Sequence, residues 1–299
     1  MNNTGKFTGT GVALITPFLE NGAIDFPALA SIIDRVIDGG SDYIVALGTT
    51  SEAPTMDEDE KRKVAAFISE HTAKRVPLVM GVGGNNTKKV CSELRSIDFT
   101  GYDAILSVCP YYNKPSQEGL FQHFMAITEE SPLPVILYNI PGRTGVNMLP
   151  QTVFRLANST PKIIGIKEAS GNLDQIEQIV KLCPKEFCVI SGDDALTVRT
   201  IMAGGVGVIS VLAHLYPMEL SSIVRCAIEK KSEEALERLH RLDLITELLF
   251  KQGNPVGVKA ALSLMGICSQ EVRLPLVKAS QELSLALKKA IESYVEFGK

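Results

Sequence analysis

The sequence predicts an α/β fold of the (β/α)8 barrel type, also called a TIM barrel, with an appended C-terminal helical region. Eight short apolar runs rich in β-branched residues recur along the first part of the chain, and helical patterns separate them. The runs cover residues 11–18, 42–48, 76–83, 103–110, 134–141, 162–169, 187–194 and 205–212. They do not alternate apolar with polar residues, which is typical of parallel strands buried on both faces. Eight such units within roughly 210 residues favour a closed barrel.

The helical patterns between the runs carry recognisable start and stop signals. Residues 26–40, FPALASIIDRVIDGG, place apolar side chains at helical spacing and end in two glycines. Residues 58–73, EDEKRKVAAFISEHTA, are acidic where a helix would begin. A doubly wound sheet is the alternative, but it fits eight regular units less well, and no GxGxxG motif follows the first strand.

The strand-like runs stop near residue 215. The sequence from residue 216 to residue 299 is helical in pattern and too long for a single closing helix, so we expect three helices or more. No linker or low-complexity stretch separates the two parts. We therefore expect a barrel core over residues 1–215 and a helical region over residues 216–299 that is not an independent domain.

Composition excludes several classes of function. The net charge is −4 and the pI is about 5.7, without blocks of like charge, so neither nucleic acid nor a membrane surface is an expected partner. No apolar stretch reaches the ~18 residues that a membrane span needs, and we expect a cytoplasmic protein. The six cysteines form no CxxC pair and are expected to be reduced and mostly buried, and the four histidines match no metal motif. We expect neither a metal nor a cofactor.

Chemically active side chains cluster where the predicted strands end, which is the face of a barrel that carries active sites. They lie in the segments GTTSE (48–52), CPYYNKPS (109–116), YNIPGRTG (138–145), IIGIKEAS (163–170) and SGDD (191–194), and next to Ile209. Lys167 ends an otherwise apolar strand. Such a lysine is most often a solvated charge, and only the surrounding hydroxyls and the arginine favour catalysis. SGDD is expected to cap the next helix, and the glycines of 203–210 to allow tight packing.

A buried lysine at this position has a definite chemistry. An apolar barrel interior disfavours the ammonium form, and a neutral amine can attack a ketone to form a Schiff base. The iminium then acts as an electron sink. Hydroxyls of Tyr111, Tyr112, Tyr138, Thr49 and Thr50 could relay protons, and Arg143 could bind a carboxylate through two hydrogen bonds. These residues together indicate an aldol-type enzyme that acts on a keto acid without a metal.

At these positions the sequence resembles the dihydrodipicolinate synthase family of pyruvate-dependent class I aldolases, which includes N-acetylneuraminate lyase. The resemblance extends from about Gly9 through the helical C-terminal region. It is carried by GTTSEAPT, PYYNKPSQEGLFQHF, LYNIPGRTG, IIGIKEASG, SGDD and GGVGVIS, in this order and spacing. The resemblance implies condensation of pyruvate with aspartate semialdehyde, the first committed step of diaminopimelate and lysine biosynthesis.

The resemblance also implies a role for each site residue. Lys167 would form the Schiff base with pyruvate, Tyr138 would act as general acid and base, and Thr49 would link Tyr138 to Tyr112 in a proton relay. Thr49 and Thr50 would meet the pyruvate carboxylate, Arg143 would bind the carboxylate of the semialdehyde, and Gly192 and Ile209 would line the site with backbone groups. Tyr112 would reach into the neighbouring subunit of a homotetramer built as a dimer of dimers.

Two alternatives remain open at this point. A lyase that cleaves a sialic acid or a 2-keto-3-deoxy sugar acid would use the same lysine, but such relatives usually lack an arginine at the position of Arg143. A non-catalytic keto-acid-binding protein on the same barrel would be expected to have lost Lys167 or a relay tyrosine, and this chain has lost neither.

The sequence departs from the family pattern at two places. Ser51 stands where glycine is commoner, which would cost strain if that position needs a positive φ. Lysine-sensitive relatives carry a serine, histidines and a glutamate at the positions of Ala53, Glu58, Lys61 and Lys89. Two lysines there should repel a bound lysine, so we predict weak or absent lysine inhibition.

Overall fold

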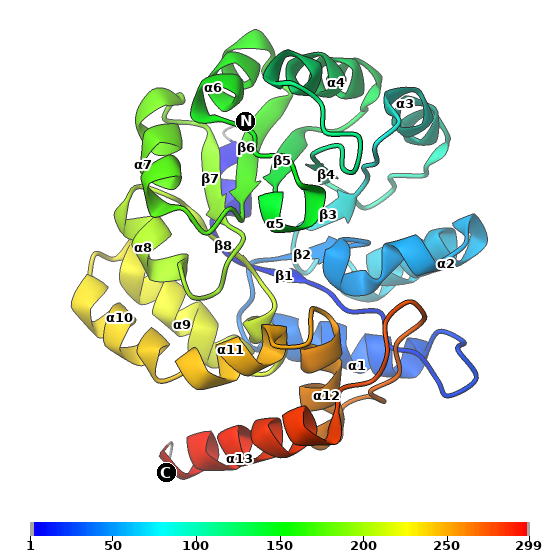
Figure 1. The fold of residues 1–299 in the computed structure, drawn as a ribbon, viewed down its shortest axis with the longest axis vertical. Helices are drawn as coiled ribbons and strands as arrows, with labels where there is room; N and C mark the ends of the chain where they lie inside the picture. The colour runs from blue at the N-terminus through cyan, green and yellow to red at the C-terminus, as the bar shows by residue number, and fades with distance from the viewer. Residues whose placement is uncertain (1–2, 298–299) are drawn as a thin grey trace.

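The protein forms a closed barrel of eight parallel strands in sequence order, surrounded by helices (Figure 1). The computed structural model describes residues 3–297. The strands are β1 (Gly9–Ala13), β2 (Tyr43–Ala46), β3 (Leu78–Gly81), β4 (Ala104–Val108), β5 (Val135–Asn139), β6 (Ile163–Glu168), β7 (Cys188–Ser191) and β8 (Gly207–Ser210). The strands β2 to β8 each lie within their predicted runs, and β1 overlaps the first run but begins two residues before it, at Gly9. The predicted (β/α)8 barrel is therefore confirmed, and the doubly wound alternative is wrong.

Helices follow the strands around the barrel and continue beyond it. They are α1 (Phe26–Asp38), α2 (Glu58–Thr72), α3 (Thr87–Ser96), α4 (Gln117–Glu130), α5 (Pro141–Thr144), α6 (Pro150–Ser159), α7 (Leu173–Leu182), α8 (Thr197–Met202), α9 (Pro217–Ile228), α10 (Ser232–His240), α11 (Asp243–Phe250), α12 (Val256–Leu264) and α13 (Gln281–Phe297). The acidic start of α2 is a capping box, in which the Asp57 side chain accepts from the Glu60 backbone N–H and the Glu60 side chain accepts from that of Asp57.

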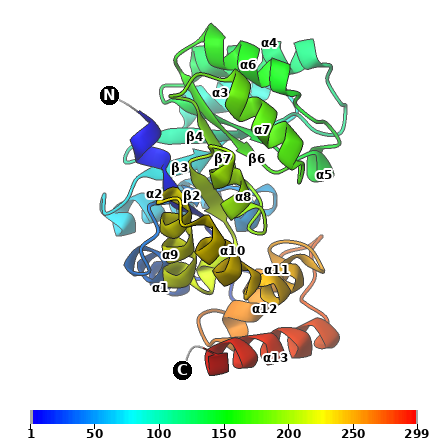
Figure 2. The same ribbon diagram turned by 90° about the vertical axis from the view of Figure 1, so that its left-hand side faces the viewer.

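Two groups of buried residues hold the barrel together, because the strands bury both faces. One group fills the barrel interior, and the other lies between the strands and the helices. Phe7, from the short helix η1 (Asn3–Phe7), packs edge-on against Tyr43 in the interior group. Figure 2 shows η1 at one end of the barrel and α5 at the other. The interior is thus filled at the end opposite to the expected site.

Glycines allow close packing where β1 meets β8, as the sequence predicts. Gly207 pairs with Gly9 across the two strands, and a Cβ at Gly207 would collide with the Gly9 backbone. This supports the interpretation of residues 203–210 as tight glycine packing.

The expectation for SGDD is wrong. Helix α8 has no side-chain cap. Asp194 is instead buried, and its Oδ2 accepts from the backbone N–H groups of Val211 and Leu212, each at 3.0 Å. The carboxylate therefore fixes the backbone just after β8. The sequence pattern around SGDD does not indicate this distant partner.

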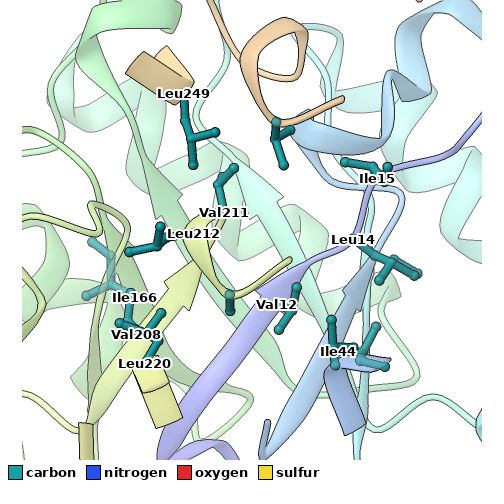
Figure 3. Packing of buried hydrophobic residues seen from close by; sticks show 14 of the residues in the cluster. Val12, Leu14, Ile15, Ile44, Ile166, Val208, Val211, Leu212, Leu220 and Leu249 are labelled. Carbon is teal, nitrogen blue, oxygen red and sulfur yellow. The ribbon is translucent and has the colours of Figure 1, made fainter. Parts of the chain in front are cut away.

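The helices after the barrel share its core. Leu249 of α11 belongs to the same cluster of buried residues as Val211 and Leu212, and Figure 3 shows the three side chains close together. Helix α9, which follows the predicted boundary at residue 215, packs against β1, α1 and α8 and closes the ring of barrel helices. The division into residues 1–215 and 216–299 stays a prediction.

No helix within residues 3–297 is long and apolar enough to cross a membrane. The predicted cytoplasmic location stays a prediction. All six cysteines are free, and four of them are buried, as expected.

Candidate active site

Lys167 points into the barrel because β6 contains an irregularity. Ile163 pairs with Val135, but Gly165 rather than Ile164 pairs with Ile136, so one extra residue is inserted in β6. Such a bulge shifts the alternation of side chains by one position. Ile164 belongs to the interior group and Ile166 to the outer one, so the next residue, Lys167, faces inward. A Cβ at Gly165 would collide with the backbone of β7, which explains the glycine at the bulge.

Lys167 lies directly against Tyr138. The two residues pair across β5 and β6, and Lys167 Nζ is 4.5 Å from the centroid of the Tyr138 ring. Each residue is only 5% exposed. The amine is therefore removed from bulk water and placed next to a phenol, a group that can serve as a general acid or base.

The chain just after β7 approaches the lysine closely. Gly192 follows β7, and a Cβ built there would lie 3.1 Å from Lys167 Cε and 2.6 Å from the Ala169 Cβ. Ile209 of β8 is 1% exposed and belongs to the interior group. The position of Gly192 thus favours glycine, because a side chain would collide with the Ala169 Cβ and crowd the lysine.

The loop after β2 carries the two threonines. Residues Thr49–Ser51 form a short 3-10 helix, in which Thr49 is half-buried and Thr50 is buried. Ser51 Oγ donates to the Gly48 carbonyl at 2.7 Å. The positive φ values of this loop fall on Leu47 and Glu52, so Ser51 is accommodated without backbone strain.

Arg143 and Thr50 meet through a residue that the sequence did not indicate. Arg143, in α5, is exposed, and its Nη2 donates to the Asn254 carbonyl at 3.2 Å. The Asn254 amide donates to Thr50 Oγ1 at 2.9 Å, and its buried Oδ1 has no partner within the described part of the chain. Asn254 comes from the turn between α11 and α12, which places the C-terminal helices beside the site.

Tyr112 lies apart from the other site residues. It is 89% exposed and has a φ of 73°, a conformation that bulky residues rarely adopt. The structure therefore brings Tyr138, Lys167 and Gly192 together, while the hydroxyl of Tyr112 is not brought to Thr49 or Tyr138 within one chain.

A cavity of about 950 Å³ opens at this end of the barrel. Its lining includes Thr49, Tyr138, Arg143 and Asn254, and it therefore reaches the ring that contacts Lys167. The same cavity is lined by the four positions at which this chain differs from lysine-sensitive relatives, namely Ala53, Glu58, Lys61 and Lys89. Lysine inhibition stays a prediction.

A buried polar network supports the ends of β5 and β6. Both Glu168 carboxylate oxygens accept from Asn139 Nδ2, at 3.2 and 3.0 Å, and Glu168 Oε2 also accepts from Gln175 at 3.1 Å. Burial raises the pKa of Glu168, and the hydrogen bonds from Asn139, Ser170 and Gln175 oppose that shift. Asn139 follows Tyr138 and Glu168 follows Lys167, so the network fixes the ends of the two strands that carry Tyr138 and Lys167. No group of three or more His, Cys, Asp or Glu side chains suited to a metal ion occurs in residues 3–297.

Sequence comparisons with known proteins all indicate the same family. The model of the dihydrodipicolinate synthetase family matches residues 6–294. A 4-hydroxy-tetrahydrodipicolinate synthase from Flavobacterium psychrophilum is 51% identical over 278 residues, which are 93% of this chain and 95% of that protein.

Solved structures agree with this match. The 4-hydroxy-tetrahydrodipicolinate synthase from Methylacidiphilum fumariolicum SolV superimposes with a TM-score of 0.94 at 40% identity, over 97% of each chain. The dihydrodipicolinate synthase from Acinetobacter baumannii complexed with pyruvate gives 0.93 at 37% identity, over 96% of this chain and 99% of that one. The matching family model, the sequence identity and the shared barrel agree, and this chain belongs to the dihydrodipicolinate synthetase family.

Proposed function

We propose that the chain condenses pyruvate with L-aspartate 4-semialdehyde to 4-hydroxy-tetrahydrodipicolinate, through a Schiff base on Lys167. The observation that carries this proposal is the buried amine of Lys167 against the Tyr138 ring, which lines the same cavity as Arg143. The activity named for the similar curated proteins supports the same reaction, an early step of lysine and diaminopimelate biosynthesis.

Lys167 acts as the nucleophile. Its neutral amine adds to the ketone carbon of pyruvate, and loss of water gives an iminium. Removal of a methyl proton converts the iminium to an enamine, whose terminal carbon attacks the aldehyde carbon of the second substrate. Tyr138 lies beside the amine and transfers these protons as general acid and base, with Thr49 and Tyr112 completing the relay.

Ring closure releases the enzyme. The amino group of the former semialdehyde attacks the iminium carbon and displaces Lys167, which leaves the cyclic imine of the product with its 4-hydroxyl group retained. One water is released overall, at the first step. Schiff-base formation, the carbon–carbon bond-forming step and ring closure all proceed without an oxidant or a reductant.

Separate parts of the site recognise the two carboxylates. Thr49 and Thr50, at the end of β2, bind the carboxylate of pyruvate, while backbone groups of Gly192 and Ile209 line the opposite side. Arg143 binds the carboxylate of the semialdehyde, because its guanidinium lies at the cavity lining and can form two parallel hydrogen bonds. The pairing of Arg143 with the Asn254 carbonyl leaves further N–H donors available.

Tyr112 completes the relay from a second subunit. An aromatic side chain that is 89% exposed and held at a positive φ is suited to packing against another copy of the chain. On this basis the active unit is a dimer, and the assembly is a homotetramer formed as a dimer of dimers.

Assay of the purified chain with both substrates tests the function. We expect the condensation product with pyruvate and the semialdehyde, and no release of pyruvate from a sialic acid or a 2-keto-3-deoxy sugar acid. Release of pyruvate from either sugar acid, without condensation, would assign the chain to the lyase branch of the family instead.

A further inference from the structure

The loop that carries Thr49 and Thr50 ends in a buried carboxylate. Glu52 directly follows the short helix Thr49–Ser51 and is 3% exposed. Its φ is 58°, in the left-handed region, where a residue with a Cβ is disfavoured. Such a conformation persists only where the surrounding structure imposes it. The contacts of the Glu52 side chain therefore impose the conformation of this loop.

Both oxygens of Glu52 are held by the C-terminal helical region. Lys259 Nζ, from α12, donates to Oε1 at 2.5 Å, and the Arg273 backbone N–H donates to Oε2 at 2.9 Å. The Lys259 side chain is 0% exposed, and that of Glu52 is 1% exposed. The carboxylate is thus fixed in orientation as well as position, by groups more than two hundred positions later in the sequence.

Lys259 is itself fully constrained. Its Nζ also donates to the Glu271 carbonyl at 2.9 Å and lies 4.1 Å from the centroid of the Phe18 ring. Burial lowers the pKa of Lys259, and the charge and hydrogen bond of Glu52 oppose that effect. The ion pair with Glu52 thus partly offsets the burial of Lys259, and the two residues act as a unit.

A buried ion pair of this kind is a poor way to gain stability. Removing two charges from water costs about as much as their attraction returns, and an apolar pair of similar volume often serves stability equally well. The pair does provide a defined geometry. Glu52 is three residues after Thr49, and the backbone N–H of Glu52 donates to the Thr49 carbonyl at 3.3 Å, so the carboxylate and the threonine move together.

We propose that Glu52 and Lys259 are positioning residues, which hold Thr49 and Thr50 in the orientation that binds the carboxylate of the keto acid. This rests on the proposed function, in which that loop receives pyruvate. Neither side chain touches substrate in this account. The C-terminal helical region thereby sets the affinity of the barrel for its first substrate.

A set of variants separates positioning from stability. Glu52→Gln leaves Lys259 as an uncompensated buried charge, whereas the double variant Glu52→Gln with Lys259→Met removes both charges. The matched control is Glu60→Gln, which weakens the partly buried ion pair of Glu60 with the Arg273 side chain on the same segment, without touching the loop. Each protein is measured for Tm and for the KM of both substrates.

We expect Glu52→Gln to lower the Tm and to raise the KM for pyruvate about tenfold, with the KM for the semialdehyde within about twofold of wild type. The double variant should recover most of the Tm but keep the raised KM for pyruvate. Glu60→Gln should change the Tm alone. If Glu52→Gln does not fold, the double variant carries the comparison.

A double variant that recovers both the Tm and the KM for pyruvate would overturn the proposal, because the pair would then serve stability only. An equal rise in both KM values would overturn it too. These outcomes are distinct from failure of the proposed function, since wild-type enzyme would still form a pyruvate adduct on Lys167. Absence of that adduct in wild type would refute the function itself.

Discussion

Lys167 Nζ lies 4.5 Å from the centroid of the Tyr138 ring, and the two residues are direct neighbours across β5 and β6. This relationship depends on the bulge at Ile164 and Gly165, since a regular strand would turn Lys167 toward the helices. The amine and the phenol are thus set side by side by strand register. Under the proposed function, loss of either group should therefore affect the chemistry directly.

Replacing Tyr138 by phenylalanine should keep the fold and lower kcat by about 10²- to 10⁴-fold, because only the proton-transferring hydroxyl is lost. Steady-state kinetics on the purified variant provides the measurement. Tyr43→Phe removes a hydroxyl from the same barrel interior at its filled end and should leave kcat unchanged. A Tyr138→Phe enzyme with nearly normal kcat would exclude Tyr138 as the acid–base group.

Replacing Arg143 by alanine should raise the KM for aspartate semialdehyde about 10- to 100-fold, the value of a lost charge-assisted hydrogen bond. The KM for pyruvate should stay nearly constant, because other residues bind that carboxylate. Arg155→Ala is the control, since Arg155 pairs with Glu118 and stacks on Phe121 away from the cavity lining. Equal losses for both substrates would show that the assigned role of Arg143 is wrong.

Replacing Gly192 by alanine should slow formation of the pyruvate adduct about 100-fold, because the new Cβ would lie 2.6 Å from the Ala169 Cβ and 3.1 Å from Lys167 Cε, and the resulting shift would misplace the amine. The rate of adduct formation under borohydride is the measurement. Gly5→Ala is the control, as a Cβ there meets nothing within 4 Å. Adduct formation at the wild-type rate in Gly192→Ala would mean that the site has room that the structure does not show.

Acid should destabilise the protein partly through His214. This ring is fully buried, with Nε2 at 3.1 Å from the Ile15 backbone N–H and Nδ1 at 2.8 Å from the Val211 carbonyl, and burial lowers its pKa to about 4. Since the folded pKa is below the ordinary value of about 6.5, the unfolded state binds the extra proton. The stabilisation from His214 is complete above pH ~6.5 and is lost as the pH falls toward ~4.

Thermal melts of wild type and His214→Gln, from neutral pH to about pH 4.5, test this prediction. The Tm difference between the two proteins should narrow as the pH falls, because glutamine does not titrate. The raised pKa values of the buried carboxyls Glu168 and Asp194 make the protein more stable as the pH falls, which is opposite to the effect of His214. Both proteins contain these carboxyls, so their contribution cancels in the Tm difference. A Tm difference that does not change with pH would contradict the predicted role of His214 in acid destabilisation. His240→Gln, at an exposed position, serves as the control.

The repetitive part of the molecule could be predicted from the sequence, because each strand and helix reflects a local pattern. Buried parallel strands need apolar runs, and their C-terminal ends must share one face of the barrel. This was enough to place Lys167 at the correct end of β6. The structural role of SGDD could not be predicted in this way, because the Asp194 carboxylate binds the backbone after β8 and not the start of the adjacent helix.

The long-range contacts of the site were also missed. Asn254 binds Thr50 from 204 positions away, and Lys259 binds Glu52 from 207 positions away. Neither residue belongs to a periodic pattern that would indicate its partner. A lysine within the apolar segment GVKAALSL of α12 was the available signal, because a buried lysine requires a partner.

Borohydride trapping with and without pyruvate, read by peptide mass spectrometry, tests the central claim most directly. We predict a reduced pyruvate adduct on the peptide that contains Lys167, formed only when pyruvate is present and absent from a Lys167→Arg variant. An unmodified Lys167 peptide, under conditions that trap a known Schiff-base aldolase, would contradict the account and leave a keto-acid-binding protein as the alternative.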